Sequence, residues 1–316
     1  MSEGVRVTAQ PNDPQIRLGT APDSWGVWLP DYHLQTPWHR FLDEVAACGY
    51  EWIELGPYGY LPTDPEQLRD ELDRRGLRVS GQAVFAALHR EDGFDSALPD
   101  ARAVAELTSA MGGRFVILLP GLHTDEFGTE VEPKELDTDA WKRLVDGNNR
   151  MARLLAEEYG CTLVFHSHAD SHVESQEQID RFLADTDPDY VQLCLDTGHV
   201  AYGGADNFQI IADHPERIGY VHLKCMDPQV LRRVVEEPLS FAQAVKEGVC
   251  VEPPAGVPDM RLISDALHGL DTELFAIVEQ DLFPCDPDLP LPIARRTRGH
   301  LRACGIGTRM RGVSST

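Results

Sequence analysis

Apolar residues gather into short runs that recur along most of the chain. Eight runs have the length of a strand, and several are continuous rather than alternating, such as RFVILLP at 114–120. Strands of a parallel sheet that is covered on both faces have this pattern. The predicted strands are residues 17–24, 52–56, 79–85, 114–120, 161–168, 191–198, 218–225 and 273–280.

Segments with helical periodicity separate these runs. Residues 38–48 place their large apolar side chains on one side, and residues 65–75 begin with a proline and are followed by Gly76. Proline at the start and glycine after the end are common boundaries of a helix. The other predicted helices are residues 101–111, 140–159, 176–184, 207–213, 260–268 and 292–304.

Strands that alternate with helices predict an α/β fold, and eight such units predict a single-domain (β/α)8 TIM barrel over residues 16–305. An open doubly wound sheet is the alternative, but no glycine-rich phosphate loop follows a predicted strand. We expect the loops at 121–136 and 226–258 to overhang the mouth of the barrel. Residues 1–15 and 306–316 are expected to be loose tails.

Ionisable side chains stand where the predicted strands end. Each run is apolar until its last residues, and the carboxyl ends of barrel strands face the active site. Polar groups at such positions need partners or a ligand. The residues that we select are Glu54, His166, His168, Glu174, Asp196, His222, Lys224 and Glu279.

These side chains predict a cation between them, because several carboxylates in one cavity repel one another unless a positive charge neutralises them. Oxygen and nitrogen ligands without thiolates suit one divalent ion, with Mn²⁺ or Co²⁺ placed before Mg²⁺, Fe²⁺ or Zn²⁺. Each residue also has a structural alternative. Asp196 and Glu279 would then form salt bridges or caps, His222 would be a core histidine, and Glu174 would lie at a helix N-terminus.

Composition excludes several classes of protein. A net charge of −24 argues against nucleic acid and against anionic membranes as partners. Seven cysteines without a CxxC pair indicate reduced thiols. The chain has neither a stretch of about 20 apolar residues nor an apolar N-terminal segment, so we expect a cytoplasmic protein.

Several segments carry a family resemblance. APDSWGVW at 21–28, FHSHADSHVESQEQIDRFL at 165–183, LCLDTGHVAYGGAD at 193–206 and YVHLKCMDP at 220–228 resemble the xylose-isomerase-like TIM barrel superfamily of sugar isomerases and epimerases. Within that superfamily, the chain is most similar to the inosose dehydratase group. The resemblance extends from about residue 16 to residue 305.

The resemblance implies a metal site. The superfamily holds its ion with Glu, Asp, His and Glu from strands five to eight, and Asp196, His222 and Glu279 match three of these positions. This chain has His166 where many relatives have the strand-five Glu. Members with the same His-x-His pattern offer a Glu a few residues later, which corresponds to Glu174. We therefore predict Glu174 as the fourth ligand, with His166 as its rival.

The resemblance also implies a reaction. A metal-dependent lyase would remove water from a keto-polyol such as an inosose through an enediolate, with His166, His168, Lys224 and Glu54 as catalytic residues. Isomerisation or epimerisation of a ketose through the same enediolate is the alternative. A β-eliminase of oxidised glycosides, an endonuclease on abasic DNA and a non-catalytic sugar-binding protein are more distant readings. A small polyol or sugar is the expected partner, and members often form dimers or tetramers.

Overall fold

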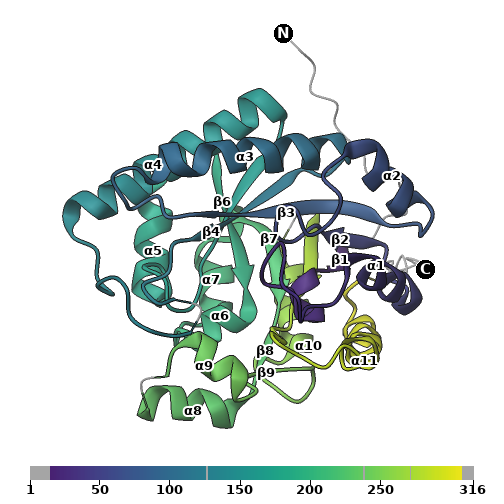
Figure 1. The fold of residues 1–316 in the computed structure, drawn as a ribbon. Coiled ribbons are helices and arrows are strands. Elements are labelled where there is room, and N and C mark those ends of the chain that lie inside the picture. The colour runs from purple at the N-terminus through teal and green to yellow at the C-terminus, as the bar shows by residue number, and fades with distance from the viewer. Residues whose placement is uncertain (1–14, 126, 238, 271, 308–316) are drawn as a thin grey trace, which may run out of the picture.

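Eight parallel strands close into a barrel in the computed structural model, which describes residues 15–125, 127–237, 239–270 and 272–307 (Figure 1). The order around the barrel is β1-β10-β7-β6-β5-β4-β3-β2, and pairing of β1 with β10 completes the ring. This confirms the predicted TIM barrel. The barrel strands are β1 (Ile16–Thr20), β2 (Trp52–Glu54), β3 (Arg78–Ala86), β4 (Phe115–Pro120), β5 (Thr162–His166), β6 (Val191–Asp196), β7 (Ile218–Leu223) and β10 (Leu274–Val278).

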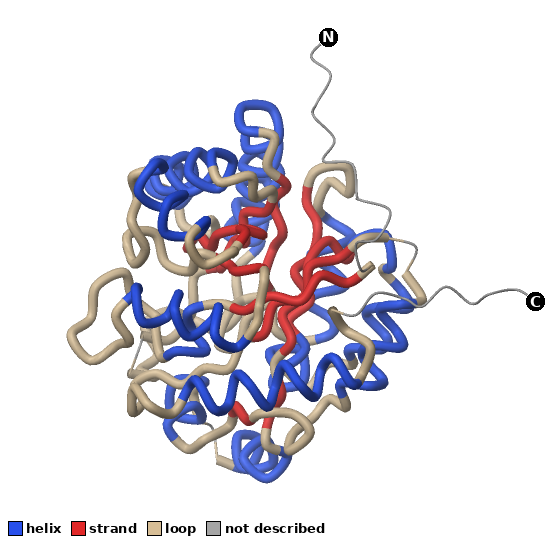
Figure 2. The backbone as a smooth tube through the Cα atoms, turned by 90° about the vertical axis from the view of Figure 1, so that its right-hand side faces the viewer, coloured by secondary structure: helices blue, strands red, loops and turns tan. Residues whose placement is uncertain are grey.

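Helices surround the strands, which lie inside the molecule in the view of Figure 2. Two short 3₁₀ helices, η1 (Pro22–Trp25) and η2 (Pro215–Arg217), accompany them. The α-helices are α1 (Trp38–Cys48), α2 (Pro65–Asp73), α3 (Gly93–Ala110), α4 (Thr138–Tyr159), α5 (Gln176–Asp185), α6 (Thr197–Tyr202), α7 (Asn207–Asp213), α8 (Pro228–Glu236), α9 (Phe241–Lys246), α10 (Met260–His268) and α11 (Pro290–Ala303).

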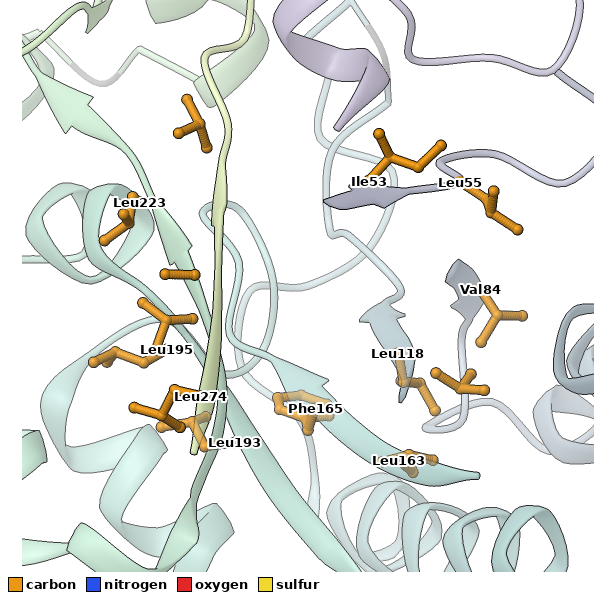
Figure 3. Close-up of a cluster of buried hydrophobic side chains, with 14 of the residues drawn as sticks. Ile53, Leu55, Val84, Leu118, Leu163, Phe165, Leu193, Leu195, Leu223 and Leu274 are labelled. Atoms are coloured by element: carbon orange, nitrogen blue, oxygen red, sulfur yellow. The ribbon is translucent and has the colours of Figure 1, made fainter. Parts of the chain in front are cut away.

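Alternation along each strand divides the core into two layers. In β5, Leu163 and Phe165 belong to the large cluster between strands and helices, part of which Figure 3 shows. Val164 belongs to the smaller cluster that fills the barrel, together with Tyr220 and Ile277 of other strands. By the same period of two, His166 at the end of β5 faces inward like Val164. The ends of the strands thus direct polar side chains toward the barrel axis, above the apolar side chains that fill the barrel.

The segment at 226–258 differs from the expected loop. It contains α8, α9 and a two-stranded antiparallel ladder of β8 (Cys225–Met226) and β9 (Cys250–Val251). Figure 1 shows α8 and α9 together at the lower edge of the molecule. Asp227 caps α8 and a Ser240–Gln243 capping box begins α9, so the signals for both helices are present in the sequence.

The C-terminal boundary lies slightly later than predicted. Ile306 is buried, and the Gly307 amide donates to the Ile16 carbonyl, so both residues pack against the barrel. The rest of the predicted tails, 1–14 and 308–316, falls outside the described residues. Within the described ranges, none of the helices combines the length and the apolar character that crossing a membrane would require.

Candidate metal centre

Four side chains converge at the carboxyl ends of neighbouring strands. His166 ends β5, Asp196 ends β6, His222 lies near the end of β7, and Glu279 follows β10. One potential ligand atom from each lies within 4.8 Å of the others. The first three are at most 1% exposed, so strand geometry rather than flexible loops holds them in place.

The contacts around His222 favour a positive charge, either a proton on its ring or a bound ion: burial opposes the charge, but neighbours that include Glu279 and Glu54 raise the pKa of His222 well above its usual value. Nδ1 of His222 lies 3.0 Å from Oε2 of Glu279 and 3.7 Å from Oδ2 of Asp196. It is buried and makes no hydrogen bond to any described residue. On the other side of the ring, Nε2 lies 2.9 Å from Oε2 of Glu54. A carboxylate accepts the Nε2 proton, so Nδ1 of a neutral His222 is a lone pair that faces two acidic groups.

This arrangement fits a divalent metal ion. Histidine ligands of metals commonly donate their other ring N–H to a carboxylate, which is the place that Glu54 occupies. His166 adds a second imidazole, with Nε2 at 3.3 Å from Oδ2 of Asp196. Two imidazoles and two carboxylates form a mixed nitrogen and oxygen donor set, which suits Mn²⁺, Co²⁺, Fe²⁺ or Zn²⁺.

Both carboxylates of the group are held in the charged form. Burial opposes ionisation of Glu279, but His222 and Lys224 lower its pKa to about 2. Burial likewise acts against Asp196, and Lys224 and His199 hold the pKa of Asp196 well below its usual value. Asp196 also accepts the backbone amides of Gly198 and His199 at the start of α6, which fixes its orientation.

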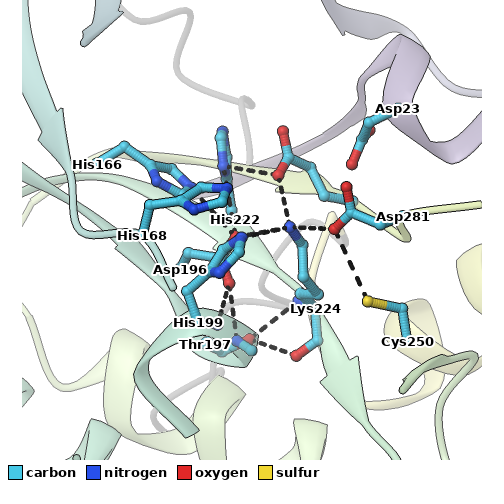
Figure 4. A network of polar contacts seen from close by, with 12 residues as sticks. Asp23, His166, His168, Asp196, Thr197, His199, His222, Lys224, Cys250 and Asp281 are labelled. Atoms are coloured by element: carbon cyan, nitrogen blue, oxygen red, sulfur yellow. Dashed lines mark hydrogen bonds and ion pairs between the residues drawn. The ribbon is translucent and has the colours of Figure 1, made fainter. Parts of the chain in front are cut away.

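Lys224 places a buried ammonium beside the four converging side chains. Its Nζ lies 2.8 Å from Oδ2 of Asp281, 3.2 Å from Oε2 of Glu279 and 3.3 Å from Oδ2 of Asp196 (Figure 4). Burial opposes the charge, but Asp196, Asp281 and Glu279 hold the pKa of Lys224 well above its usual value. Lys224 therefore carries a proton at neutral pH.

His168 is a neutral imidazole next to the same group (Figure 4). Its Nδ1 lies 2.6 Å from the Ala169 carbonyl, which can only accept, so the ring proton is on Nδ1 and Nε2 is free to take a proton. Burial, followed by repulsion from His166, lowers the pKa of His168 to about 3.

Comparison with known protein families identifies the family of this chain. The family described as xylose isomerase-like TIM barrel matches residues 42–302. The chain belongs to this family. Two inosose dehydratases are similar to this family member over most of both lengths. The protein of Geobacillus thermodenitrificans is 30% identical over 92% of this chain and 98% of its own, and that of Geobacillus kaustophilus is 33% identical over 85% and 88%.

Solved structures share the fold at low sequence identity. The IOLI protein, solved with a zinc atom, has a TM-score of 0.69 at 17% identity and covers 90% of this chain and 97% of its own. L-ribulose 3-epimerase has a TM-score of 0.66 at 20% identity, with 92% and 96% covered. At these identities the likeness concerns the barrel alone.

Glu174, predicted as the fourth ligand, does not join the converging group of this family member. Its Oε1 pairs with Nζ of Lys134 at 2.6 Å, and its Oε2 accepts the Asp170 amide at 2.8 Å. The chain leaves the barrel after His166, and Asp170 reverses its course with a positive φ of 59°. The structure therefore brings His166, the rival ligand, to the position that we expected Glu174 to take.

The other selected residues divide into two sets. His168 and Lys224 border the converging group, whereas Glu54 lies behind His222 and is 2% exposed. Among the aromatic residues that follow the first two strands, Trp25 and Tyr60 are buried in the core.

Sequence reasoning did not single out Asp23, which lies in η1. Burial and the charges of Glu279 and Asp281 raise the pKa of the Asp23 carboxyl well above its usual value. Asp23 belongs to the APDSW segment, but no sequence pattern distinguishes its carboxylate from that of an aspartate that caps a helix.

Proposed function

We propose that this protein is a metal-dependent hydro-lyase that removes water from a keto-polyol such as an inosose through an enediolate. The observation that carries the proposal is the pairing of a charged Lys224 and a neutral His168 beside four converging ligands. Elimination of water needs one group that gives a proton and one that takes a proton. The protonated Lys224 and the neutral His168 can fill these two roles. Similarity to curated inosose dehydratases over nearly the whole chain supports this substrate class.

The four converging residues His166, Asp196, His222 and Glu279 would hold the ion, which we propose to be Mn²⁺ or Co²⁺. When bound, such an ion supplies Lewis-acid stabilisation of the negative charge that develops on the substrate carbonyl oxygen. Glu54 keeps His222 in the tautomer whose Nδ1 faces the ion. Because Asp196 and Glu279 stay ionised, the site retains its charge across the neutral range.

The protein's own groups move two protons. His168 takes the α-proton of the substrate at Nε2, and the electron pair of the C–H bond enters the enediolate. Lys224 then gives a proton from Nζ to the β-hydroxyl. The enediolate returns to a carbonyl, its electron pair forms the new C=C bond, and the pair of the breaking C–O bond leaves with the oxygen as water. The ammonium lies against Asp281, which is 8% exposed and also accepts from Nε1 of Trp28 at 2.8 Å. Asp281 thus orients the proton donor.

Ketose isomerisation or epimerisation through the same enediolate is the second candidate, since the same ligands and the same proton acceptor would serve it. The two reactions differ in the fate of the β-hydroxyl. Lys224 favours dehydration because it offers a charged proton donor beside the ligands. The cytoplasmic location and the assembly into a dimer or tetramer remain predictions from the sequence.

The deciding experiment combines metal removal with product analysis. Protein stripped with EDTA and reloaded with Mn²⁺ or Co²⁺ is incubated with inososes and ketohexoses in D₂O. A dehydratase gives an ultraviolet-absorbing dione or enone from an inosose, whereas an epimerase gives deuterated isomers without loss of water. Stripped protein should be inactive. An inosose that stays unchanged with every metal would contradict the proposal.

Lys224→Met tests the proton donor separately. We expect kcat to fall about 10²–10⁴-fold because general-acid assistance is lost. Metal content should persist, because none of the four ligands is removed. Lys246→Met on α9 is the matched control, because Lys246 is exposed, and it should leave kcat unchanged.

A further inference from the structure

A second set of potential metal ligands lies in the loops of the barrel mouth. His89 follows β3, Glu132 lies between β4 and α4, and His172 lies between β5 and α5. One ligand atom of each lies within 4.8 Å of the other two. Both histidines are 4% exposed, and their rings are 4.6 Å apart between centroids. None of these residues belongs to the group formed by the strand ends.

The proton positions at His172 leave a lone pair without a partner. Its Nδ1 lies 2.9 Å from the Lys134 carbonyl, which can only accept, so Nδ1 carries the ring proton. Nε2 is then unprotonated in the neutral ring. It is buried and has no hydrogen-bond partner among the described residues, yet it lies 3.6 Å from Oε2 of Glu132. A buried lone pair that faces a carboxylate oxygen is unfavourable unless a proton or a cation lies between the two atoms.

The remaining two residues are prepared for the same cation. Nε2 of His89 lies 2.6 Å from Oε2 of Glu132, so the rings of His89 and His172 both face this carboxylate oxygen. An ion at this place would replace the proton between His89 and Glu132. The Arg90 guanidinium holds the other oxygen, Oε1, with its Nε at 2.6 Å.

A neighbouring group is less suited to an ion. His123, Asp170 and Glu174 also approach one another, but both carboxylates there accept from groups that cannot bind a metal, whereas Oε2 of Glu132 contacts only histidine rings among the described residues. Asp170 accepts from the Phe241 amide and the Thr124 hydroxyl, while Glu174 pairs with a lysine. An ion at that place would have to displace these contacts.

We propose that His89, Glu132 and His172 bind a second divalent cation of the Zn²⁺ class. Two imidazoles and one carboxylate form a common three-ligand zinc set, which leaves the fourth position for water. The ion would join the loops that follow β3, β4 and β5. Since Glu132 lies in the long segment between β4 and α4, the ion would hold this segment against the loops that follow β3 and β5.

Metal counting tests the site independently of catalysis. Full-length protein is stripped with EDTA, equilibrated with Zn²⁺, freed of unbound ion, and measured by mass spectrometry of the elements. The wild-type chain should hold two ions, and His172→Gln and Glu132→Gln should each hold one. An Asp196→Ala, His222→Ala double variant should also hold one, which separates this site from the proposed catalytic ion.

His214→Gln is the matched control. Its Nε2 lies 2.9 Å from a carboxylate oxygen of Asp180, as His89 does from Glu132, but the two belong to no described group of three ligands. This variant should keep two ions. A wild-type chain with one ion, or two ions retained in both His172→Gln and Glu132→Gln, would overturn the proposal. If His172→Gln does not fold by circular dichroism, Glu132→Gln decides the result.

A second measurement concerns the loop. In the Asp196→Ala, His222→Ala protein, Zn²⁺ should slow proteolysis between residues 121 and 137 at least several-fold. Adding His172→Gln to this protein should abolish the protection. Equal cleavage rates with and without Zn²⁺ would show that the ion does not hold the loop.

Discussion

Glu54 acts through another residue, because its carboxylate lies behind His222 and away from the converging ligand atoms. We predict that Glu54→Gln weakens metal affinity about 10-fold, toward the lower end of the usual 10–100-fold effect, since the amide oxygen can still accept from Nε2. Metal titration of stripped protein measures this change. Glu51→Gln is the control, because that side chain is 70% exposed and forms a surface ion pair with Arg78. Equal affinity in wild type and Glu54→Gln would contradict the positioning role.

The cysteines permit a second prediction at the scale of single residues. All seven are free thiols, and all except Cys285 are buried. Burial raises the pKa of Cys161 to about 11 and that of Cys225 to about 12, so the thiolate fraction of both at pH 8 is very small. Iodoacetamide reacts with the thiolate. Native protein at pH 8 should therefore be modified at Cys285 first, and its buried thiols should react only after unfolding.

Intact-mass and peptide analysis after timed alkylation would check the order of modification. Raising the pH toward 10 should speed modification of Cys285, whose pKa is also raised by burial, before that of Cys161. Urea supplies the control, since all seven sites should become reactive together. Rapid alkylation of Cys161 in native protein at pH 8 would show that its surroundings are more open than the structure indicates.

At the scale of elements, the sequence predicts the strands well because several are continuous apolar runs that end in polar groups. The same reasoning places Asp196, His222 and Glu279, since each ends a strand or nearly so and the barrel brings strand ends together. Glu174 differs because it comes eight positions after the end of β5. The direction of the Glu174 side chain depends on the reversal of the chain at Asp170. Hydrogen bonds from Thr124 and Phe241 to Asp170 stabilise this reversal. Those contacts come from segments that are distant in the sequence, a loop and the start of α9, and no local pattern predicts them.

Helix α5 allows a test of local structure near this reversal. Ser175 caps the helix, and Gln178 bonds back to the amides of Glu174 and Ser175. We predict that Ser175→Ala lowers the free energy of unfolding by about 0.5–2 kcal/mol, because one helix-end amide loses its acceptor. Urea denaturation measures the change. Ser109→Ala, at an exposed position near the end of α3, should be neutral within about 0.5 kcal/mol. Equal losses in both variants would contradict a capping effect.

At the scale of the whole molecule, charge and fold are separate properties. The barrel closes through the pairing of β1 with β10, the first and last of its strands. Eight apolar runs without a glycine-rich phosphate loop favour this closure over an open sheet. The excess of acidic residues contributes nothing to that topology. It places 52 carboxylates and 28 basic groups on one chain, so many acidic side chains repel one another without a basic partner.

This repulsion predicts how salt affects stability. Raising KCl from about 0.01 M to about 1 M shortens the screening length from about 30 Å to about 3 Å. Exposed ion pairs such as Arg102–Glu158 contribute only about 0–1 kcal/mol each, so their weakening costs little. Net repulsion between carboxylates then dominates, and the midpoint of thermal unfolding at pH 7 should rise steadily with KCl. Calorimetry near the isoelectric point, about pH 4.7, is the control, because the salt effect should vanish or reverse there. A midpoint at pH 7 that falls with KCl would mean that attractive pairs outweigh the repulsion of the excess acidic charge.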